Sequence, residues 1–431
     1  MYLLERAQLW IQGENVGLLK GNLETNIRQG GLRMKWFAST LLVFSLSVIS
    51  STSYAEVISV SDSDKSADHG NKIEDIKKTI RIPGIPNNIW TFGLEEDGIL
   101  GYGSDNNYTM GVSIAHLFRE APDESSLASL PWSVADFIDN KIPCKLKQDW
   151  CDKGATQFYW WHLGGSGFSP NNVKTSAPIY DDRPFAALFF WSAGYMRNNN
   201  GVFSDRKKVE LHVGLLGTPV GYWLQSGIHS IFAPDDMPQG WPHQIGNGFS
   251  PTFLFQENWI KDLKMGENLQ NFGMNFSYGY AVGYWVKANS GVSFQYGPTQ
   301  ADRDAQVGTL PQLPQTFAIA DNPNSTAPII REKPVGFSIW LNGDFNAFAY
   351  NEMLRGAWFG QNDVTLSPSQ INPYVFQGTV GVDLSFIPKY IFCMNPEKYR
   401  LFATYNIRNN EITTSHGANH SWGGIFFSHY Y

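Results

Sequence analysis

Apolar and polar residues alternate with a period of two along much of the chain. In residues 209–215 the odd positions are Val, Leu, Val and Leu, and the even positions are Glu210, His212 and Gly214. Residues 274–286 repeat the pattern, with mostly aromatic residues at even positions and mostly small or polar residues at odd positions. Successive side chains of a β-strand point to opposite faces, so this alternation predicts strands with one apolar face and one small or polar face. On this pattern His212 is a polar residue that faces the interior.

The same alternation recurs up to the end of the chain. It predicts further strands at residues 90–94, 108–114, 185–195, 335–341, 374–386, 399–407 and 425–431, the last of which ends on an aromatic residue. Long strands with aromatic outward faces and polar inward faces are typical of outer-membrane barrels, whose strand number is even. We therefore predict an all-β fold, a transmembrane antiparallel β-barrel of about 12 strands in contact with outer-membrane lipids. The alternative, a soluble sandwich, does not normally require so many outward tyrosines and tryptophans.

Composition supports a membrane barrel and argues against other classes. The 431 residues are 15% aromatic and only 16% charged, with a net charge of −7. Beyond the N-terminal region no run of about eighteen apolar residues occurs, which excludes transmembrane helices. The mild acidity lacks the basic patch that a nucleic-acid partner requires.

The N-terminal region carries an export signal. Residues 34–55 have a short basic start, an apolar core at Leu41–Ile49 and small residues that end at Ala55. This is the pattern of a signal peptide, so we expect Met34 to be the true start and the mature protein to begin at Glu56. The expected organisation is 1–33 as non-native upstream sequence, 34–55 as the signal peptide, 56–85 as a flexible lead-in and 86–431 as the outer-membrane barrel enzyme domain.

The three cysteines of the chain predict at most one local disulfide. Cys144 and Cys151 enclose a short polar segment, and in an exported protein this spacing favours a disulfide that pins a loop. Cys393 is then unpaired. No quartet of Cys and His ligands can be assembled around it, which argues against a zinc site.

A polar cluster interrupts the strand pattern at residues 222–253. Gln225 and His229 stand four residues apart, so a helix would place both side chains on one face. A Gly/Pro-rich loop with Trp241 and His243 follows. Between two barrel strands, this cluster is expected to form a loop or short helix at the extracellular rim. A histidine in such a loop is ordinarily a surface residue, but an imidazole titrates near neutral pH and can also act as a general base.

Several motifs, taken in order, carry a resemblance to a known family. They are Leu94–Gly98 (LEEDG), residues 105–111 (DNNYTMG), residues 181–186 (DDRPFA), and Gln225–His229 (QSGIH) followed by residues 240–244 (GWPHQ). Together they resemble the outer-membrane lipid A 3′-O-deacylases, from about Trp90 to the last residue. The resemblance implies a barrel enzyme that uses Ca²⁺ to remove the 3′-linked acyloxyacyl chain of lipid A, the lipid part of lipopolysaccharide.

The resemblance also implies roles for the matching residues. The catalytic set would be His229 as general base, Gln225 beside it, and Asp97 and Thr109 on the calcium and carbonyl side. Lys174 would contact a lipid A phosphate. On their oxygen donors, Glu96, Asp97 and Thr109 are the candidate metal ligands. Arg183 and Trp241 are further candidates for substrate binding. The chain departs from the family at Glu96 and Met110, where the family usually has asparagine.

Simpler interpretations exist for several of these residues. Residues 95–97 could be a solvated strand end, because acidic clusters usually are. Arg183 could form a structural ion pair with Asp182 at the mouth of the barrel. Trp241 could be an interfacial anchor instead of a substrate platform.

The sequence favours attack by water over a covalent serine mechanism. No serine stands in a Gly-x-Ser-x-Gly elbow, the usual mark of such a nucleophile. Ca²⁺ prefers several oxygen ligands and would act as a Lewis acid on the ester carbonyl. The prediction is a monomeric ester hydrolase of the outer membrane. An outer-membrane phospholipase, or a barrel without activity that serves as a pore or adhesin, remains an alternative.

Overall fold

The fold is described from a computed structural model of the chain. It covers residues 88–98, 107–118, 121–122, 129–141, 156–198, 206–263, 272–296, 335–386 and 398–430. The expected upstream sequence, signal peptide and lead-in lie outside the described residues, as do Cys144, Cys151 and Cys393.

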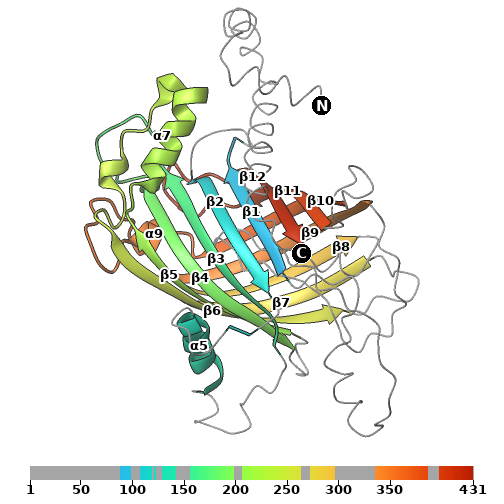
Figure 1. Cartoon of the computed structure of the whole chain (residues 1–431). Coiled ribbons are helices and arrows are strands. Elements are labelled where there is room, and N and C mark those ends of the chain that lie inside the picture. Colours follow the sequence, from blue (N-terminus) through green and yellow to red (C-terminus); the bar gives the residue numbers. More distant parts are fainter. Residues whose placement is uncertain are drawn as a thin grey trace, which may run out of the picture. The chain divides into compact units, whose positions relative to one another are not determined.

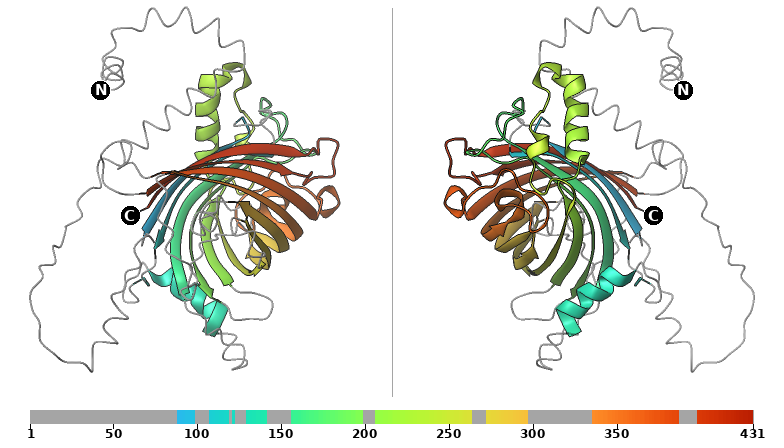
Figure 2. Two further views of the ribbon diagram at one scale, coloured as in Figure 1. Left: turned by 90° about the vertical axis from the view of Figure 1, so that its right-hand side faces the viewer. Right: turned by 90° about the vertical axis from the view of Figure 1, so that its left-hand side faces the viewer.

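Twelve antiparallel strands close into a barrel, which confirms the predicted fold (Figures 1 and 2). Each strand pairs with its neighbours in the chain, and β1 pairs with β12 to close the sheet. The strands are β1 (Asn88–Glu96), β2 (Asn107–Phe118), β3 (Thr156–Ser169), β4 (Ala186–Asn198), β5 (Arg206–Leu216), β6 (Ser250–Leu263), β7 (Phe272–Gly283), β8 (Trp285–Tyr296), β9 (Val335–Asn351), β10 (Tyr374–Phe386), β11 (Lys398–Arg408) and β12 (His420–Tyr430).

Short helices lie in the connections at both ends of the barrel. Figure 1 shows α5 at one end and α7 at the other. Of the helices in the described ranges, none is long and apolar enough to cross a bilayer. They are α5 (Leu130–Asp136) and the π-helical turn η2 (Phe137–Lys141) between β2 and β3; α7 (Val220–Phe232), η4 (Pro234–Asp236) and η5 (Trp241–His243) between β5 and β6; and α9 (Glu352–Arg355) and η7 (Pro368–Gln370) between β9 and β10.

The two faces of the strands carry the residues that alternation predicts. On β5, Val213 and Leu215 are exposed on the outer wall of the barrel, whereas Glu210 and His212 are buried inside. The Glu210 carboxylate accepts hydrogen bonds from Ser192 Oγ and Gln256 Nε2, both at 2.8 Å. Buried carboxylates are stable only when such partners compensate their lost hydration. Polar pairs therefore hold the interior, and this exposed part of the outer wall is apolar.

One predicted strand is two strands in the structure. Residues 274–286 alternate without interruption, yet β7 ends at Gly283 and β8 begins at Trp285. Gly283 has φ +147°, which L side chains rarely adopt, and a Cβ there would collide with the Phe253 carbonyl oxygen. Glycine thus permits a reversal that the apolar pattern hides. Tyr284, the connecting residue, is buried, and its N–H donates to the same Phe253 oxygen at 2.8 Å.

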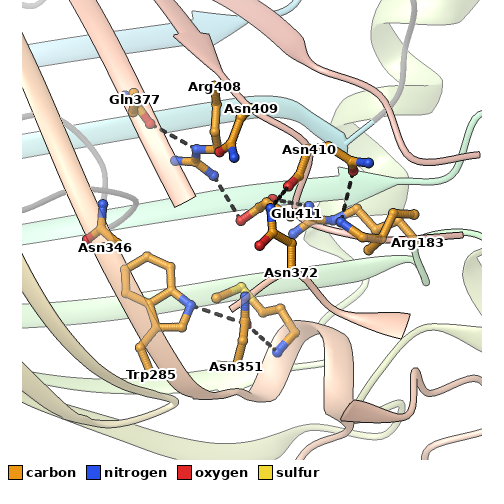
Figure 3. A network of polar contacts seen from close by, with 12 residues as sticks. Arg183, Trp285, Asn346, Asn351, Asn372, Gln377, Arg408, Asn409, Asn410 and Glu411 are labelled. Atoms are coloured by element: carbon orange, nitrogen blue, oxygen red, sulfur yellow. Dashed lines mark hydrogen bonds and ion pairs between the residues drawn. The ribbon is translucent and has the colours of Figure 1, made fainter. Parts of the chain in front are cut away.

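A buried ion network crosses the barrel at the end that carries α7. Figure 3 shows Glu411, in the β11–β12 connection, between the guanidinium groups of Arg183 and Arg408. Arg408 Nε also donates to Gln377 Oε1 at 2.9 Å. Burial alone would raise the pKa of Glu411, but Arg183 and Arg408 outweigh it and lower this pKa to about 2. The carboxylate therefore stays charged and ties the connections at this end together.

Acid should weaken the barrel through Glu411. Its pKa falls from an ordinary value of 4.5 to about 2 on folding. The group therefore stabilises the folded state above pH 4.5 by on the order of 3 kcal/mol, and this contribution is lost as the pH falls through the folded pKa. Glu411→Gln should lower the free energy of unfolding by a similar amount at neutral pH and remove this part of the acid sensitivity. Urea titration in detergent measures both effects.

The matched control is Asp181→Asn, because Asp181 is an exposed carboxylate. It should leave the unfolding curve nearly unchanged, since exposed ion pairs contribute little. If Glu411→Gln unfolds with the same midpoint and the same acid response as the parent, the network does not stabilise the fold.

Candidate functional site on the outer wall beneath α7

The helix α7 packs against the outer wall of the barrel, where small residues make room for it. Ser169 and Ala187 occupy outward positions near the ends of β3 and β4, and α7 contacts both strands. Gly221 in the first turn of α7 lies close to the wall, because a Cβ there would stand 2.8 Å from the Ala187 Cβ and closer still to the Trp241 ring. Small outward residues and a helical glycine together allow this close approach.

The expected helix is present and turns its two polar residues toward the wall. Gln225 and His229 are one helical turn apart in α7, and both are buried, His229 to 3% exposure. Trp223 and Ile231, on the opposite side of the helix, are 64% and 73% exposed. α7 therefore presents polar groups to the barrel and apolar groups to the surroundings, the reverse of a helix on a water-soluble protein.

Facing α7, the hydroxyls of Thr109 and Ser169 meet at the ends of β2 and β3, and Asp97 directly follows the neighbouring strand β1. We call Asp97, Thr109 and Ser169 the wall cluster. All three are buried. The Asp97 N–H donates to the Thr109 carbonyl at 3.2 Å, and the Thr109 and Ser169 hydroxyls share a hydrogen bond.

A β-bulge explains why Thr109 faces Ser169. The β2–β3 register shifts between Tyr108 and Met110, and bulges re-aim the side chains beside them. Tyr108 turns inward, where its hydroxyl donates to Glu95 Oε2 at 2.7 Å. Glu95 is accordingly a buried interior residue and not part of a solvated strand end.

Gln225 joins α7 to the wall cluster. Its amide nitrogen donates to Ser169 Oγ at 3.4 Å, and its amide oxygen accepts from Trp241 Nε1 at 2.7 Å. Trp241 is itself buried against Val173 and Phe185. Because the indole can only donate, it fixes which end of the Gln225 amide points toward the wall. The structure thus places Trp241 inside the site, under α7, as a support for Gln225.

A backbone carbonyl fixes the tautomer of His229. The ring Nδ1 lies 2.5 Å from the Asp236 carbonyl oxygen. A carbonyl only accepts, so Nδ1 carries the hydrogen and Nε2 is the nitrogen that can take up a proton. The Asp236 carboxylate forms an ion pair with Lys174, whose hydrogen bond lowers the pKa of Asp236. Asp236 therefore contacts both the exposed Lys174, through its carboxylate, and His229, through its main-chain carbonyl.

One of the predicted site residues, Arg183, does not join this group. Arg183 is buried and pairs with Glu411, so its ionic partner is not the Asp182 that the sequence suggested. The Asp182 carboxylate instead accepts from the N–H groups of Asn171 and Arg183. Glu96 is partly buried at the last position of β1, and strand alternation points it to the outer face, opposite Glu95 and on the side that carries the site.

The structure adds two residues that the sequence analysis missed. Ser169 bridges Thr109 and Gln225, and Asp236 acts through its main-chain oxygen. Ser169 is a polar residue at an outward position of a barrel strand, which is a usable signal once the strand is recognised. A main-chain contact leaves no such signal.

The donors of the wall cluster are all oxygen atoms. Across the part of the chain that the structure describes, no three or more His, Cys, Asp or Glu side chains gather as a metal site. One buried carboxylate, a main-chain carbonyl and two hydroxyls are nevertheless a donor set that suits a hard cation such as Ca²⁺, with further oxygens from water or substrate. The residues present therefore fit calcium better than zinc, which prefers nitrogen and sulfur.

Comparison with known proteins identifies the family. A family model described as "Outer membrane protein LpxR" matches residues 53–431. The chain belongs to the LpxR family. No curated protein matches it well enough to count as a relative. Among solved structures, LpxR from Salmonella typhimurium is similar, with 14% sequence identity, a TM-score of 0.51, and coverage of 80% of this chain and 100% of that chain. The NanC porin is a more distant match, with 8% identity, a TM-score of 0.27, and coverage of 80% and 98%.

Membership of the LpxR family confirms the resemblance seen in the sequence. It places the chain in the bacterial outer membrane and makes it an ester hydrolase, a lipid A 3′-O-deacylase by family. The similarity to the Salmonella structure confirms the barrel.

Proposed function

We propose that the protein hydrolyses the 3′-O-linked acyloxyacyl ester of lipid A in the outer leaflet, with Ca²⁺ bound and with His229 as the general base that activates water. One observation carries the proposal. A buried histidine, its tautomer set by the Asp236 carbonyl, lies on the same helix face as Gln225, which reaches the wall cluster. Geometry and protonation state are the two requirements of a general base.

The position of the site supports a lipid substrate. It lies on the outer wall beneath α7, and the helix turns Trp223 and Ile231 outward. A membrane lipid can reach this surface laterally without entering the barrel. A water-soluble ester would have no comparable path, because exposed apolar side chains here would face hydrocarbon.

The residues of the site divide the chemical work. Nε2 of His229 takes the proton of the attacking water, and the bond from Nδ1–H to the Asp236 carbonyl strengthens as the ring becomes positive. Trp241 holds Gln225 so that its N–H groups face the wall cluster, where they can orient water or the substrate oxygen. As the bond between the acyl carbon and the sugar oxygen breaks, His229 returns the proton to that oxygen, which leaves as a hydroxyl, and the base is regenerated.

Calcium would be held by the wall cluster. Asp97 and Thr109 would be ligands, Glu96 would contribute its carboxylate from the end of β1, and Ser169 adds a hydroxyl that the sequence did not suggest. When bound, the ion would polarise the ester carbonyl as a Lewis acid.

Lys174 is the proposed contact for a lipid A phosphate. Its ammonium group is exposed and pairs with Asp236 on the surface of the α7 region. An exposed ion pair is weak, so an anionic headgroup can compete for this cation. Arg183 has its guanidinium committed to Glu411 inside the barrel, and this placement does not support a substrate contact for it.

Mass spectrometry of lipid A from cells with and without the protein tests the function. Expression should produce a species that has lost the 3′-linked acyloxyacyl group, and the protein should act as a monomer. Release of fatty acid from phospholipid with intact lipid A would instead support the phospholipase alternative. Ion conductance in planar bilayers without change to any lipid would support a pore.

A further inference from the structure

The helix α5 has two apolar faces, of which one packs against the barrel and the other is largely exposed. Trp132 and Ala135 pack against Ala193, Tyr195 and Val209 on the outer wall of β4 and β5. On the opposite side, Leu130, Val134 and Phe137 are 58%, 37% and 44% exposed. Their spacing of four and three residues places them on one stripe of the helix.

The α5–η2 segment is firmly attached to the barrel, so its exposed stripe has a fixed direction. Trp132 Nε1 donates to the carbonyls of Trp160 and Gly194 at 3.1 and 2.9 Å. Arg197, on β4, pairs with Asp136 at 3.0 Å.

Further polar contacts anchor η2. The Tyr195 hydroxyl donates to Asp139 Oδ2 at 2.7 Å, and Lys207 of β5 pairs with the same buried carboxylate. These partners sit at outward positions of β4 and β5, where the segment shields their charges from lipid. The apolar stripe therefore points away from the barrel.

The helix lies within a belt of outward aromatic residues. Phe118 and Trp191 lie edge-on to the Trp132 ring of α5, and Tyr159 and Trp161 pack against the same hydrophobic cluster. The belt continues along the barrel wall on both sides of the helix. Trp90 stacks on His116 at 4.5 Å between ring centroids, and Trp259 stacks on Tyr278 at 5.5 Å. Aromatic girdles mark the boundary between headgroups and hydrocarbon in outer-membrane barrels. The exposed stripe of α5 is continuous with this boundary.

We propose that the α5–η2 segment lies in the membrane interface and that Leu130, Val134 and Phe137 contact phospholipid acyl chains of the periplasmic leaflet. The choice of leaflet rests on the proposed function, because α7 and the lipid A site lie at the opposite end of the barrel (Figure 1). A protein partner fits less well. Three side chains on about two helical turns cannot supply the ~800 Å² per partner that a stable protein interface buries.

Site-specific photo-crosslinking tests the proposal in intact outer membranes. p-Benzoylphenylalanine replaces Phe137, which it resembles in shape, and mass spectrometry identifies what is captured. We expect a mass shift equal to one phospholipid. Phe294, an exposed outward residue of β8, provides the membrane control, and Gln239, an exposed residue in the α7–β6 connection, provides the control outside the wall. Heat-modifiable migration verifies folding, and the same probe at Leu130 repeats the test.

Each outcome decides the matter. Capture of phospholipid at Phe137 and Phe294, but not at Gln239, supports the proposal. Capture of a polypeptide at Phe137, or no capture there while Phe294 reacts, overturns it. Capture of lipopolysaccharide at Phe137 would overturn the proposal, because it would place α5 in the outer leaflet. Failure of the proposed deacylase function would be seen separately, as unchanged lipid A in the mass spectra.

Discussion

His229→Ala should lower the rate of lipid A deacylation at least about a hundredfold, the low end of what loss of a general base costs. The ring lies on the buried side of α7 and is bonded to the Asp236 carbonyl, so the variant loses the nitrogen that we propose as the acceptor of the water proton. Folding should survive, because α7 lies outside the barrel sheet. Deacylation of purified lipopolysaccharide, followed by mass spectrometry, measures the rate, and heat-modifiable migration verifies the barrel.

His243→Ala is the matched control. His243 lies in the same connection, but its ring nitrogens contact the Asp363 carboxylate and the Ser176 carbonyl, both at 3.0 Å, away from the wall cluster. It should keep most of the activity. If His229→Ala works at the parent rate, another group activates water and the mechanism proposed here is wrong.

Removal of calcium should abolish activity, and Asp97→Ala should mimic it. Asp97 is the buried carboxylate of the wall cluster, and a Lewis acid at an ester carbonyl supplies several kcal/mol of transition-state stabilisation, or about a hundredfold or more in rate. A chelator should stop deacylation and excess Ca²⁺ should restore it. Calcium-dependent protection against thermal unfolding, present in the parent and absent in Asp97→Ala, provides a readout independent of turnover.

Asp363→Ala removes a carboxylate outside the wall cluster and should keep both calcium protection and most activity. Full activity of the parent in excess chelator would exclude the metal from the mechanism. Loss of activity in Asp97→Ala with unchanged calcium protection would mean that Asp97 acts without binding the ion.

The strands that could be predicted from the sequence are those whose outer faces contact lipid. The strands that were not predicted explain this limit. In β5 and β10 the alternation indicated which residues point outward, because the side that faces lipid must be apolar. Two of the strands not recognised, β3 and β6, have parts of their outer faces covered by protein. The covered part of β3 carries Gly167 and Ser169, and β6 carries Glu257, an outward charge near Lys207. A strand face that packs against a helix does not contact lipid and can carry small or polar side chains. The alternation of apolar and polar residues is therefore lost there.

The candidate site was predictable only as far as local spacing reached. The distance of four residues between Gln225 and His229 implied one helix face, and the helix has that form. The partner of Arg183 is Glu411, far along the chain, and no local pattern could indicate it. The main-chain contact between His229 and Asp236 depends on how η4 turns back under α7, which side-chain chemistry does not encode.

The outward apolar side of α7 has a kinetic consequence. An enzyme whose site opens sideways into a bilayer meets its substrate by diffusion in two dimensions, so the relevant concentration is the mole fraction of lipid A among neighbouring lipids and not an amount per volume. Dilution of lipid A with an inert lipid at constant total substrate should therefore slow turnover, and dilution of the vesicles in buffer should not. The released fatty acid and the trimmed lipid both leave along the membrane plane, which makes the composition of the outer leaflet, before and after reaction, the natural control on how fast this enzyme works.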